Sequence, residues 1–319
     1  MLMQLVFVTI CSIGLIFECA AFGQNYPNKP IRLITGDVGG SLDFSARLIA
    51  QDLTKVLGQQ VIVDNRGGGG SAVAGQTVAK ATPDGYTLLF YSSTFWLLPL
   101  MRDLPYDPVK DFAPITSALM TPGLLVVHPS VAANSVKDLI ALAKLKPGAL
   151  NYASAGSGSS SHLAMELFKA MAGVNIVHVP YKGGGPAGVD LMSGRVQIMI
   201  QSAPAVIPFV KTGRLKALAV GSLGPSALFP EIPAVAATLP GYEAVLRTGL
   251  FAPVTTSAAI IDRLGQETVR ILNRVEVKAQ FFNAGAEVIG GSPNQLASAI
   301  KTEITSMSQV IKNAGIKAD

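Results

Sequence analysis

Two glycine-rich turns, each followed by an amphipathic helix, are the segments of this sequence best suited to chemistry. In residues 31–47 a short apolar segment leads into Gly39 and Gly40 and then into a helical pattern. Glycines let a ligand approach the backbone closely, and the free amide groups of a first helical turn favour an anion. Residues 150–163 repeat this arrangement. The two turns predict a small anion held from two sides.

The predicted contact residues lie in these turns and at the carboxyl ends of nearby strands, where open α/β sheets bind ligands. Lys182 is included because its ammonium group could neutralise a carboxylate. The predicted ligand-binding residues are Val38, Gly39, Gly40, Ser41, Ser92, Ser93, Thr94, Gly156, Ser157, Gly158, Ser159, His162, Tyr181 and Lys182.

The first 23 residues are predicted to be a signal peptide. Residues 5–17 are uncharged and too short to anchor the chain, and Ala21-Phe22-Gly23 resembles a cleavage site before Gln24. The start is atypical because it contains no Lys or Arg. The chain is therefore expected to be exported. Cys11 and Cys19 both lie in this leader, so disulfides and cysteine nucleophiles are not expected in the mature protein.

The charge of the chain gives no sign of a nucleic-acid-binding protein. Only 14% of the residues are charged, the formal net charge is +5, and no run of Lys and Arg occurs. Without the leader the chain still exceeds the size at which one hydrophobic core usually stops growing. Two domains are therefore expected.

Strand patterns alternate with helix patterns almost to the end, which predicts an α/β protein with parallel-rich sheets. A final helix begins with Ser292-Pro293-Asn294-Gln295, a capping box, and is expected to pack on the first domain. The second domain would then be inserted into the first, with a crossover hinge between them. The expected division is a signal peptide at 1–23, domain 1 at 24–123 and 246–319, and domain 2 at 124–245. The expected strands include residues 60–64, 86–91, 150–153, 175–179, 196–200, 215–220 and 250–254, and the expected helices include 42–57 and 162–172.

Motifs along nearly all of residues 26–319 follow a characteristic order. They include GQQVIVDNRGGGGSAVAG, LNYASAGSGSSSHLAMELFKAMAG and HVPYKGGGPAGVDLMSGRVQIM. These motifs resemble the Bug family, the periplasmic solute-binding proteins of tripartite tricarboxylate transporters. The resemblance implies a type II, two-lobed periplasmic-binding-protein fold, no enzymatic activity and no cofactor. It also implies capture of a small carboxylate for a separate membrane permease, by a protein expected to be a monomer.

The first loop departs from the family pattern. It reads Gly-Asp-Val-Gly-Gly at residues 36–40, which is one residue shorter than usual and acidic. Asp37 could reject a carboxylate, or it could contact a cationic group on an amino acid-like ligand. The identity of the ligand is therefore open.

Several other readings of the same residues compete with ligand binding. His162 and Glu166 share a helix face but lack a third metal ligand, so a capping or core histidine is favoured and no metal is expected. A serine among residues 154–161 together with His162 would give an exported serine hydrolase, although no Gly-x-Ser-x-Gly elbow is present. A periplasmic sensing module for a receptor kinase is a third alternative.

For other residues a structural role is the alternative to binding. Asp43 is expected to stabilise the first turn of its helix. The glycines at 67–70 lack nucleotide-binding spacing. Phe95 and Trp96 are either core residues or the floor of the pocket.

Overall fold

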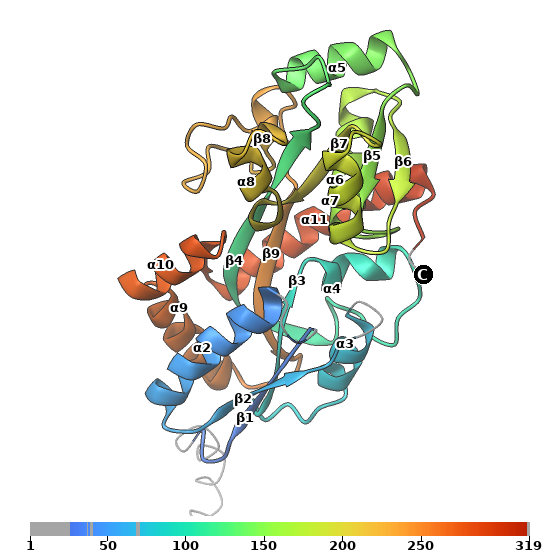
Figure 1. The fold of residues 1–319 in the computed structure, drawn as a ribbon. Coiled ribbons are helices and arrows are strands. Elements are labelled where there is room, and N and C mark those ends of the chain that lie inside the picture. The colour runs from blue at the N-terminus through green and yellow to red at the C-terminus, as the bar shows by residue number, and fades with distance from the viewer. Residues whose placement is uncertain (1–25, 37, 39–40, 68–70, 318–319) are drawn as a thin grey trace, which may run out of the picture.

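The computed structural model describes residues 26–36, 38, 41–67 and 71–317. These residues form an elongated α/β molecule built on one ten-stranded mixed sheet, with helices packed on its faces (Figure 1). The main strand order is β2-β1-β3-β9-β4-β7-β5-β6, and β8 and β10 pair with β4 outside this path. None of the helices in the described ranges has the length and apolar composition needed to cross a membrane.

The N-terminal part of the chain forms a parallel segment of the sheet. Strand β1 (Ile31–Thr35) lies between β2 (Val61–Asn65) and β3 (Thr87–Ser92). Helix α2 (Ser41–Leu57) buries one face on this segment, and Gly58, at φ 69°, ends it. Helix α3 (Ala72–Ala79) also packs here. The predicted alternation of strands and helices in this region is confirmed, whereas the glycines at 39–40 and 68–70 lie outside the described residues.

Strand β4 (Phe112–Val127) is the longest strand and connects the two halves of the molecule. Its first half lies between β9 (Val245–Pro253) and β10 (Glu287–Gly291), and its second half lies between β8 (Lys216–Val220) and β7 (Ile198–Ser202). All four pairings are antiparallel. The centre of the sheet is therefore antiparallel, whereas both outer segments are parallel.

The middle of the chain forms the other half of the molecule, at the top of Figure 1. Strand β5 (Asn151–Ser154) pairs in parallel with β6 (Val177–Pro180) and with β7. Its helices are α5 (Val136–Leu145), α6 (Ser160–Ala172), α7 (Gly184–Met192) and α8 (Ala203–Lys211). Ser135 caps α5 by accepting from the backbone amide of Asp138, a role for which serine is well suited.

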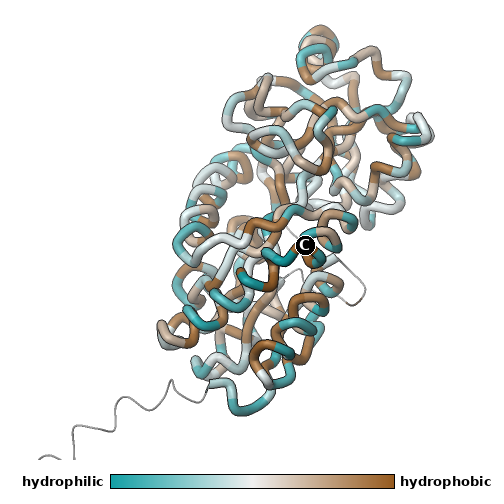
Figure 2. Tube along the Cα trace, turned by 90° about the vertical axis from the view of Figure 1, so that its left-hand side faces the viewer, coloured by the Kyte–Doolittle hydropathy of each residue, from teal (hydrophilic) through white to brown (hydrophobic). Residues whose placement is uncertain are grey.

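The chain ends in three helices, α9 (Ala258–Leu272), α10 (Val275–Asn283) and α11 (Pro293–Ala314). The predicted capping box at the start of α11 is confirmed, because Ser292 and Gln295 each accept the other's backbone amide. Hydrophilic and hydrophobic residues alternate along the helices (Figure 2). However, α11 packs on α6 as well as on β4 and α4 (Thr94–Leu97), so it does not contact the N-terminal part alone. An apolar stripe specifies the buried face of a helix but not its partner.

Three chain segments meet where β4 passes between the halves. The backbone amide of Gly123 donates to Ala244 at 3.1 Å, Ala244 donates to Gly221 at 2.7 Å, and Gly221 donates to Gly123 at 2.7 Å. A Cβ atom on Gly221 would lie 2.4 Å from the Ala244 carbonyl oxygen. This close crossing therefore requires glycine at position 221.

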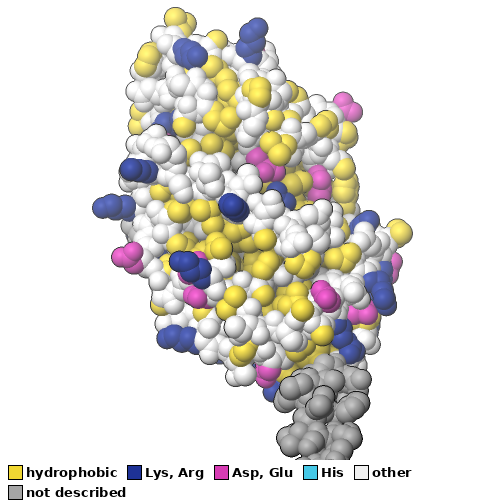
Figure 3. All heavy atoms as spheres, turned by 180° about the vertical axis from the view of Figure 1, so that it is seen from behind, with side chains coloured by type: hydrophobic (Ala, Val, Ile, Leu, Met, Phe, Trp, Pro, Cys, Tyr) yellow, Lys and Arg dark blue, Asp and Glu magenta, His cyan; other side chains and the backbone are white. Residues whose placement is uncertain are grey.

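The surface carries its charge in a dispersed pattern. On the back of the molecule the Lys and Arg side chains are scattered among acidic side chains, and hydrophobic side chains extend across the middle (Figure 3). No basic stripe of the kind that tracks a nucleic-acid backbone is visible on this face.

Candidate ligand-binding site

A cavity of about 1250 Å³ lies between the two halves of the molecule. Its walls include residues from the first turns of α2, α6 and α8, which come from both halves. These residues are Ser41, Phe44, Ser45, Ser160, Ser161, Leu163, Ser202, Pro204 and Ala205. Each helix N-terminus carries a partial positive charge and free amide groups. The convergence of three such ends makes the cavity favourable for an anion.

The remaining wall combines hydroxyl and amide groups with apolar side chains. Ser93, Thr94, Thr121 and Gln201 supply hydroxyl and amide groups. The apolar residues include Leu97, Leu167, Met171, Ile200, Met307 and Val310. A ligand with both an anionic group and an apolar body would therefore match this lining.

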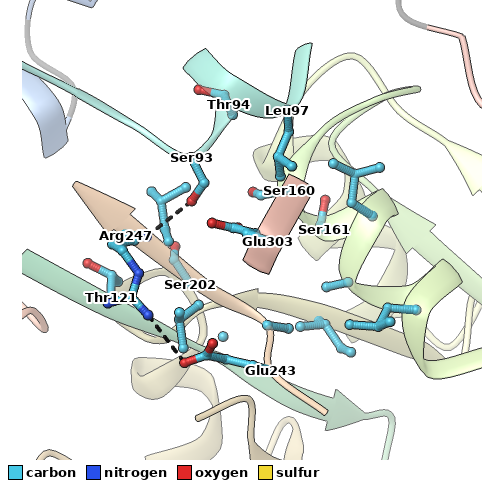
Figure 4. A pocket seen from close by; sticks show the side chains of 18 of the residues that line it. Ser93, Thr94, Leu97, Thr121, Ser160, Ser161, Ser202, Glu243, Arg247 and Glu303 are labelled. Atoms are coloured by element: carbon cyan, nitrogen blue, oxygen red, sulfur yellow. Dashed lines mark hydrogen bonds and ion pairs between the residues drawn. The ribbon is translucent and has the colours of Figure 1, made fainter. Parts of the chain in front are cut away.

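Only three of the described lining residues are charged, namely Glu243, Arg247 and Glu303. Arg247 Nη2 lies 3.4 Å from Glu243 Oε1, and the Arg247 backbone amide donates to Ser93 Oγ at 3.1 Å (Figure 4). Glu303 points from α11 into the space near Ser93 and Arg247. Trp96 Nε1 donates to Glu303 Oε2 at 2.9 Å. These contacts join α4, β9 and α11 at one wall of the cavity.

The carboxyl group of Glu303 is shifted toward its neutral form. Burial raises its pKa to about 7, and the negative charge of Glu243 adds to this effect. The Trp96 hydrogen bond, the charge of Arg247 and the Ser93 hydroxyl oppose it. A carboxyl group with this pKa changes charge near neutral pH.

The structure brings three of the predicted contact residues, Ser41, Ser93 and Thr94, to this cavity. Gly39 and Gly40 lie outside the described residues. The others are not among the described lining residues: Val38, Ser92, Gly156, Ser157, Gly158, Ser159, His162, Tyr181 and Lys182. Within the second turn, the cavity is instead lined by Ser160 and Ser161, which directly follow the predicted serines.

The turn at residues 156–159 has a clear structural role. Ser159 caps α6, donates from its hydroxyl to the Gly156 carbonyl at 2.7 Å and accepts from the backbone amide of His162. His162 Nδ1 accepts from the Gly158 backbone amide at 3.0 Å. The interpretation of His162 as a capping histidine is therefore confirmed by its hydrogen bond.

A second cavity of about 640 Å³ lies beside this turn. Ser157, His162, Glu166, Lys169 and His178 line it on one side, and residues 313–317 line it on the other. The His162 and His178 rings stack at 3.9 Å, and Tyr152 stacks on His178 at 4.8 Å. Burial, reinforced by the neighbouring His178, lowers the pKa of His162 to about 4, and burial lowers the pKa of His178 as well. The two rings are therefore neutral at pH 7.

The described residues at this turn form no metal cluster, and the serine that contacts a histidine ring here is inaccessible. No group of three potential metal ligands occurs among the described residues. Ser154 Oγ lies 2.7 Å from His178 Nε2, which is the distance of a nucleophile–base pair. However, Ser154 is 0% exposed, so a substrate could not reach its hydroxyl group.

The structure also decides the roles that the sequence left open. Phe95 and Trp96 are both fully buried core residues, although Trp96 positions Glu303 at the cavity wall. Asp43 is buried, pairs with Arg47 at 2.9 Å and accepts from Asn65 Nδ2 at 2.9 Å. Its role is therefore structural. Lys182 is exposed, and the Tyr181 hydroxyl donates to Asp190 at 2.9 Å.

Sequence reasoning did not identify Glu243, Arg247 or Glu303. Glu243 and Arg247 lie four residues apart in LPGYEAVLR, a segment with no recognised chemical motif, and Glu303 falls within the amphipathic pattern of α11. A charge on the edge of an apolar helix stripe is the one local signal that could have indicated Glu303.

The chain shows similarity to known proteins along most of its length. The model of the tripartite tricarboxylate transporter family receptor matches residues 45–316. Protein BugT of Bordetella pertussis is 35% identical over 321 residues, which cover 99% of this chain and 98% of BugT.

Solved structures show the same similarity. An R. palustris protein with adipate is 35% identical, with a TM-score of 0.76 and coverage of 92% of this chain and 99% of that chain. MatC from Rhodopseudomonas palustris, with bound malate, is 29% identical, with a TM-score of 0.73 and coverage of 90% and 100%. The fold is thus the two-lobed α/β fold of periplasmic binding proteins, and the chain belongs to the Bug-type receptors of the tripartite tricarboxylate transporter family.

Proposed function

We propose that this protein captures a small carboxylate in the cavity between its lobes and delivers it to the membrane permease of a tripartite tricarboxylate transporter. The observation that carries the proposal is the convergence of the first turns of α2, α6 and α8 on one cavity. Similar proteins hold adipate and malate, and both are carboxylates.

We further propose that the lobes correspond to residues 24–123 with 246–319, and 124–245. The change of strand partners along β4 at Gly123 supports this division. The hydrogen bonds that join Gly123, Gly221 and Ala244 would form the hinge. Closure about such a hinge would bring the α6 and α8 ends toward the α2 end and hold the anion between them.

Thermal melting of the ligand-stripped mature chain tests carboxylate capture. The panel should contain mono-, di- and tricarboxylates, aromatic acids, amino acids, nucleotides and divalent metals. At a ligand concentration of a hundred times Kd, linkage stabilises the protein by about 2.7 kcal/mol. Stabilisation by nucleotides or metals alone would contradict the proposal.

Substitution of two serines that lie three residues apart tests which of the two cavities binds the ligand. Ser160 lines the large cavity, whereas Ser157 lines the small one. Ser160→Ala should lose a hydrogen bond to a charged group, about 1.5–3 kcal/mol or roughly 10- to 150-fold in affinity. Ser157→Ala is the matched control and should bind normally in calorimetry. Normal binding by Ser160→Ala together with weakened binding by Ser157→Ala would place the ligand beside His162.

His162→Ala separates a binding protein from the hydrolase alternative. A binding protein should keep most of its carboxylate affinity, because His162 does not line the large cavity. A hydrolase that used His162 as its base would lose turnover.

Export is proposed with cleavage near Gly23 and a soluble monomer as the product. Intact-mass analysis of periplasmic protein tests the processing. A mature mass that still contains Cys19 would contradict it, and size-exclusion chromatography with light scattering tests the monomer.

A further inference from the structure

Glu303 is the one charged side chain that α11 contributes to the large cavity. Its carboxyl group is held in place rather than free to rotate, because Trp96 Nε1 donates to Oε2 at 2.9 Å and the Ser93 hydroxyl makes a further hydrogen bond. Trp96 is fully buried, so its indole is a rigid support. The carboxyl group therefore faces the cavity in a fixed orientation (Figure 4).

Glu303 and Glu243 share one cation. Arg247 on β9 is the one cation among the described lining residues, and it lies 3.4 Å from the carboxylate of Glu243. The described lining residues of α2, α4, α6 and α8 carry no charge. Ionised Glu303 would thus be a second negative charge in a cavity with a single cation. Burial outweighs the opposing charge of Arg247 and raises the pKa of Glu303 to about 7 in the free protein.

A bound carboxylate would bring another negative charge into this cavity. Two carboxyl groups in one poorly solvated site do not both ionise readily, and the usual outcome is that they share a proton. A neutral Glu303 can donate its O–H to the ligand carboxylate, whereas an ionised Glu303 can only accept. Binding should therefore increase the proton occupancy of Glu303.

We propose that Glu303 binds the ligand as a neutral carboxylic acid that donates a hydrogen bond to the ligand carboxylate, so that capture takes up a proton from solvent. This inference rests on the proposed carboxylate-binding function and specifies the ligand as one without an ammonium group near Glu303. The proton comes from water or buffer, and no covalent bond changes.

An amino acid-like ligand would have the opposite effect. An ammonium group placed against Glu303 would stabilise the ionised carboxylate and lower its pKa. Binding would then release a proton instead of taking one up. The sign of the proton exchange therefore identifies the charge that the ligand presents to α11.

Calorimetry of the full mature chain tests the proposal with adipate, malate and benzoate as probes. Titrations at pH 8 in buffers of different ionisation enthalpy give the number of protons exchanged. For at least one probe we expect uptake approaching one proton. Its affinity should fall by about tenfold per pH unit above pH 7.

Glu303→Gln and Glu231→Gln form the matched pair. Glutamine keeps an acceptor for Trp96 and a donor for the ligand but has no proton to exchange. Glu303→Gln should abolish the uptake and make affinity independent of pH between 6 and 8.5. Glu231 is exposed and lies outside the cavity lining, so Glu231→Gln should behave like the wild type.

Each other outcome counts against the proposal. Proton release on binding, binding without proton exchange, or uptake that persists in Glu303→Gln would overturn the role of Glu303 and leave carboxylate capture intact. Failure of all three probes to bind, extended to the whole carboxylate panel, would overturn carboxylate capture and this inference together. Melting of each variant without ligand verifies that it is folded.

Discussion

The crossing of three chain segments at Gly221 provides a quantitative test of the structure. Replacing Gly221 with Ala would put a Cβ atom 2.4 Å from the Ala244 carbonyl oxygen and 3.2 Å from the Gly123 carbonyl oxygen. Ordinary contacts of this kind begin near 3.5 Å, so the backbone would have to move by about 1 Å. Both obstructing atoms belong to the backbone, and no side-chain rotation can relieve the clash.

The expected loss of stability follows from two contributions. Overpacking of this type costs about 1–3 kcal/mol. The movement also strains the 2.7 Å hydrogen bonds that Gly221 makes with Gly123 and Ala244, each worth about 0.5–1.5 kcal/mol. We therefore expect Gly221→Ala to lower the free energy of unfolding by about 2–4 kcal/mol. At about 2–4 °C per kcal/mol, the Tm should fall by roughly 4–16 °C.

Gly224→Ala is the matched control in the same connection. A Cβ atom on Gly224 would meet nothing within 4 Å, and neither glycine has a positive φ. The control should be neutral, or slightly stabilising by about 0.4–1 kcal/mol through the unfolded state. Denaturant unfolding of both variants is the assay. A difference between them below about 0.5 kcal/mol would refute the crossing geometry.

Two further predictions concern the contact between the lobes and the histidine pair. Gly285, at φ +76°, would place a Cβ atom 2.3 Å from Pro204 Cγ, whereas Gly315, at φ +63°, has open space. Gly285→Ala should therefore weaken carboxylate binding by about 5- to 150-fold relative to Gly315→Ala in calorimetry, and equal affinities would exclude this contact from the bound state. The pKa values of His162 and His178 are lowered on folding. Unfolding should take up protons below about pH 6.5, so stability should fall by up to about 3 kcal/mol toward pH 4. The free energy of unfolding, measured at several pH values, should fall less toward pH 4 in His162→Phe than in the wild type. An identical pH dependence in the two proteins would contradict the lowered pKa of His162.

Elements with strong local signals could be predicted from the sequence. The capping box before α11, the Ser135 cap of α5 and the glycine after α2 act over three or four residues, so no distant partner is needed to read them. Strand β4 was not predicted as a strand. It contains Pro114, Pro122 and Gly123, which locally disfavour strands. It is stable in the fold because other strands pair with it on both sides.

The residues of the candidate site also differ in whether a local sequence pattern indicates them. Ser41, Ser93 and Thr94 could be found because each lies where a strand gives way to a helix, and this position is visible in the sequence. The sequence by itself thus determined the α/β class, the helix ends that are proposed to bind the anion and the family resemblance, all of which depend on residues close together in the chain.

Only the tertiary structure decided which side chains share the cavity. Trp96 and Glu303 are 207 residues apart, and Ser93 and Arg247 are 154 residues apart. Their contacts depend on how α11 and β9 return to the N-terminal part of the sheet, and no local pattern encodes that return. The charge state of Glu303 likewise depends on its burial in the folded protein, because desolvation is a property of the assembled cavity and not of the residue.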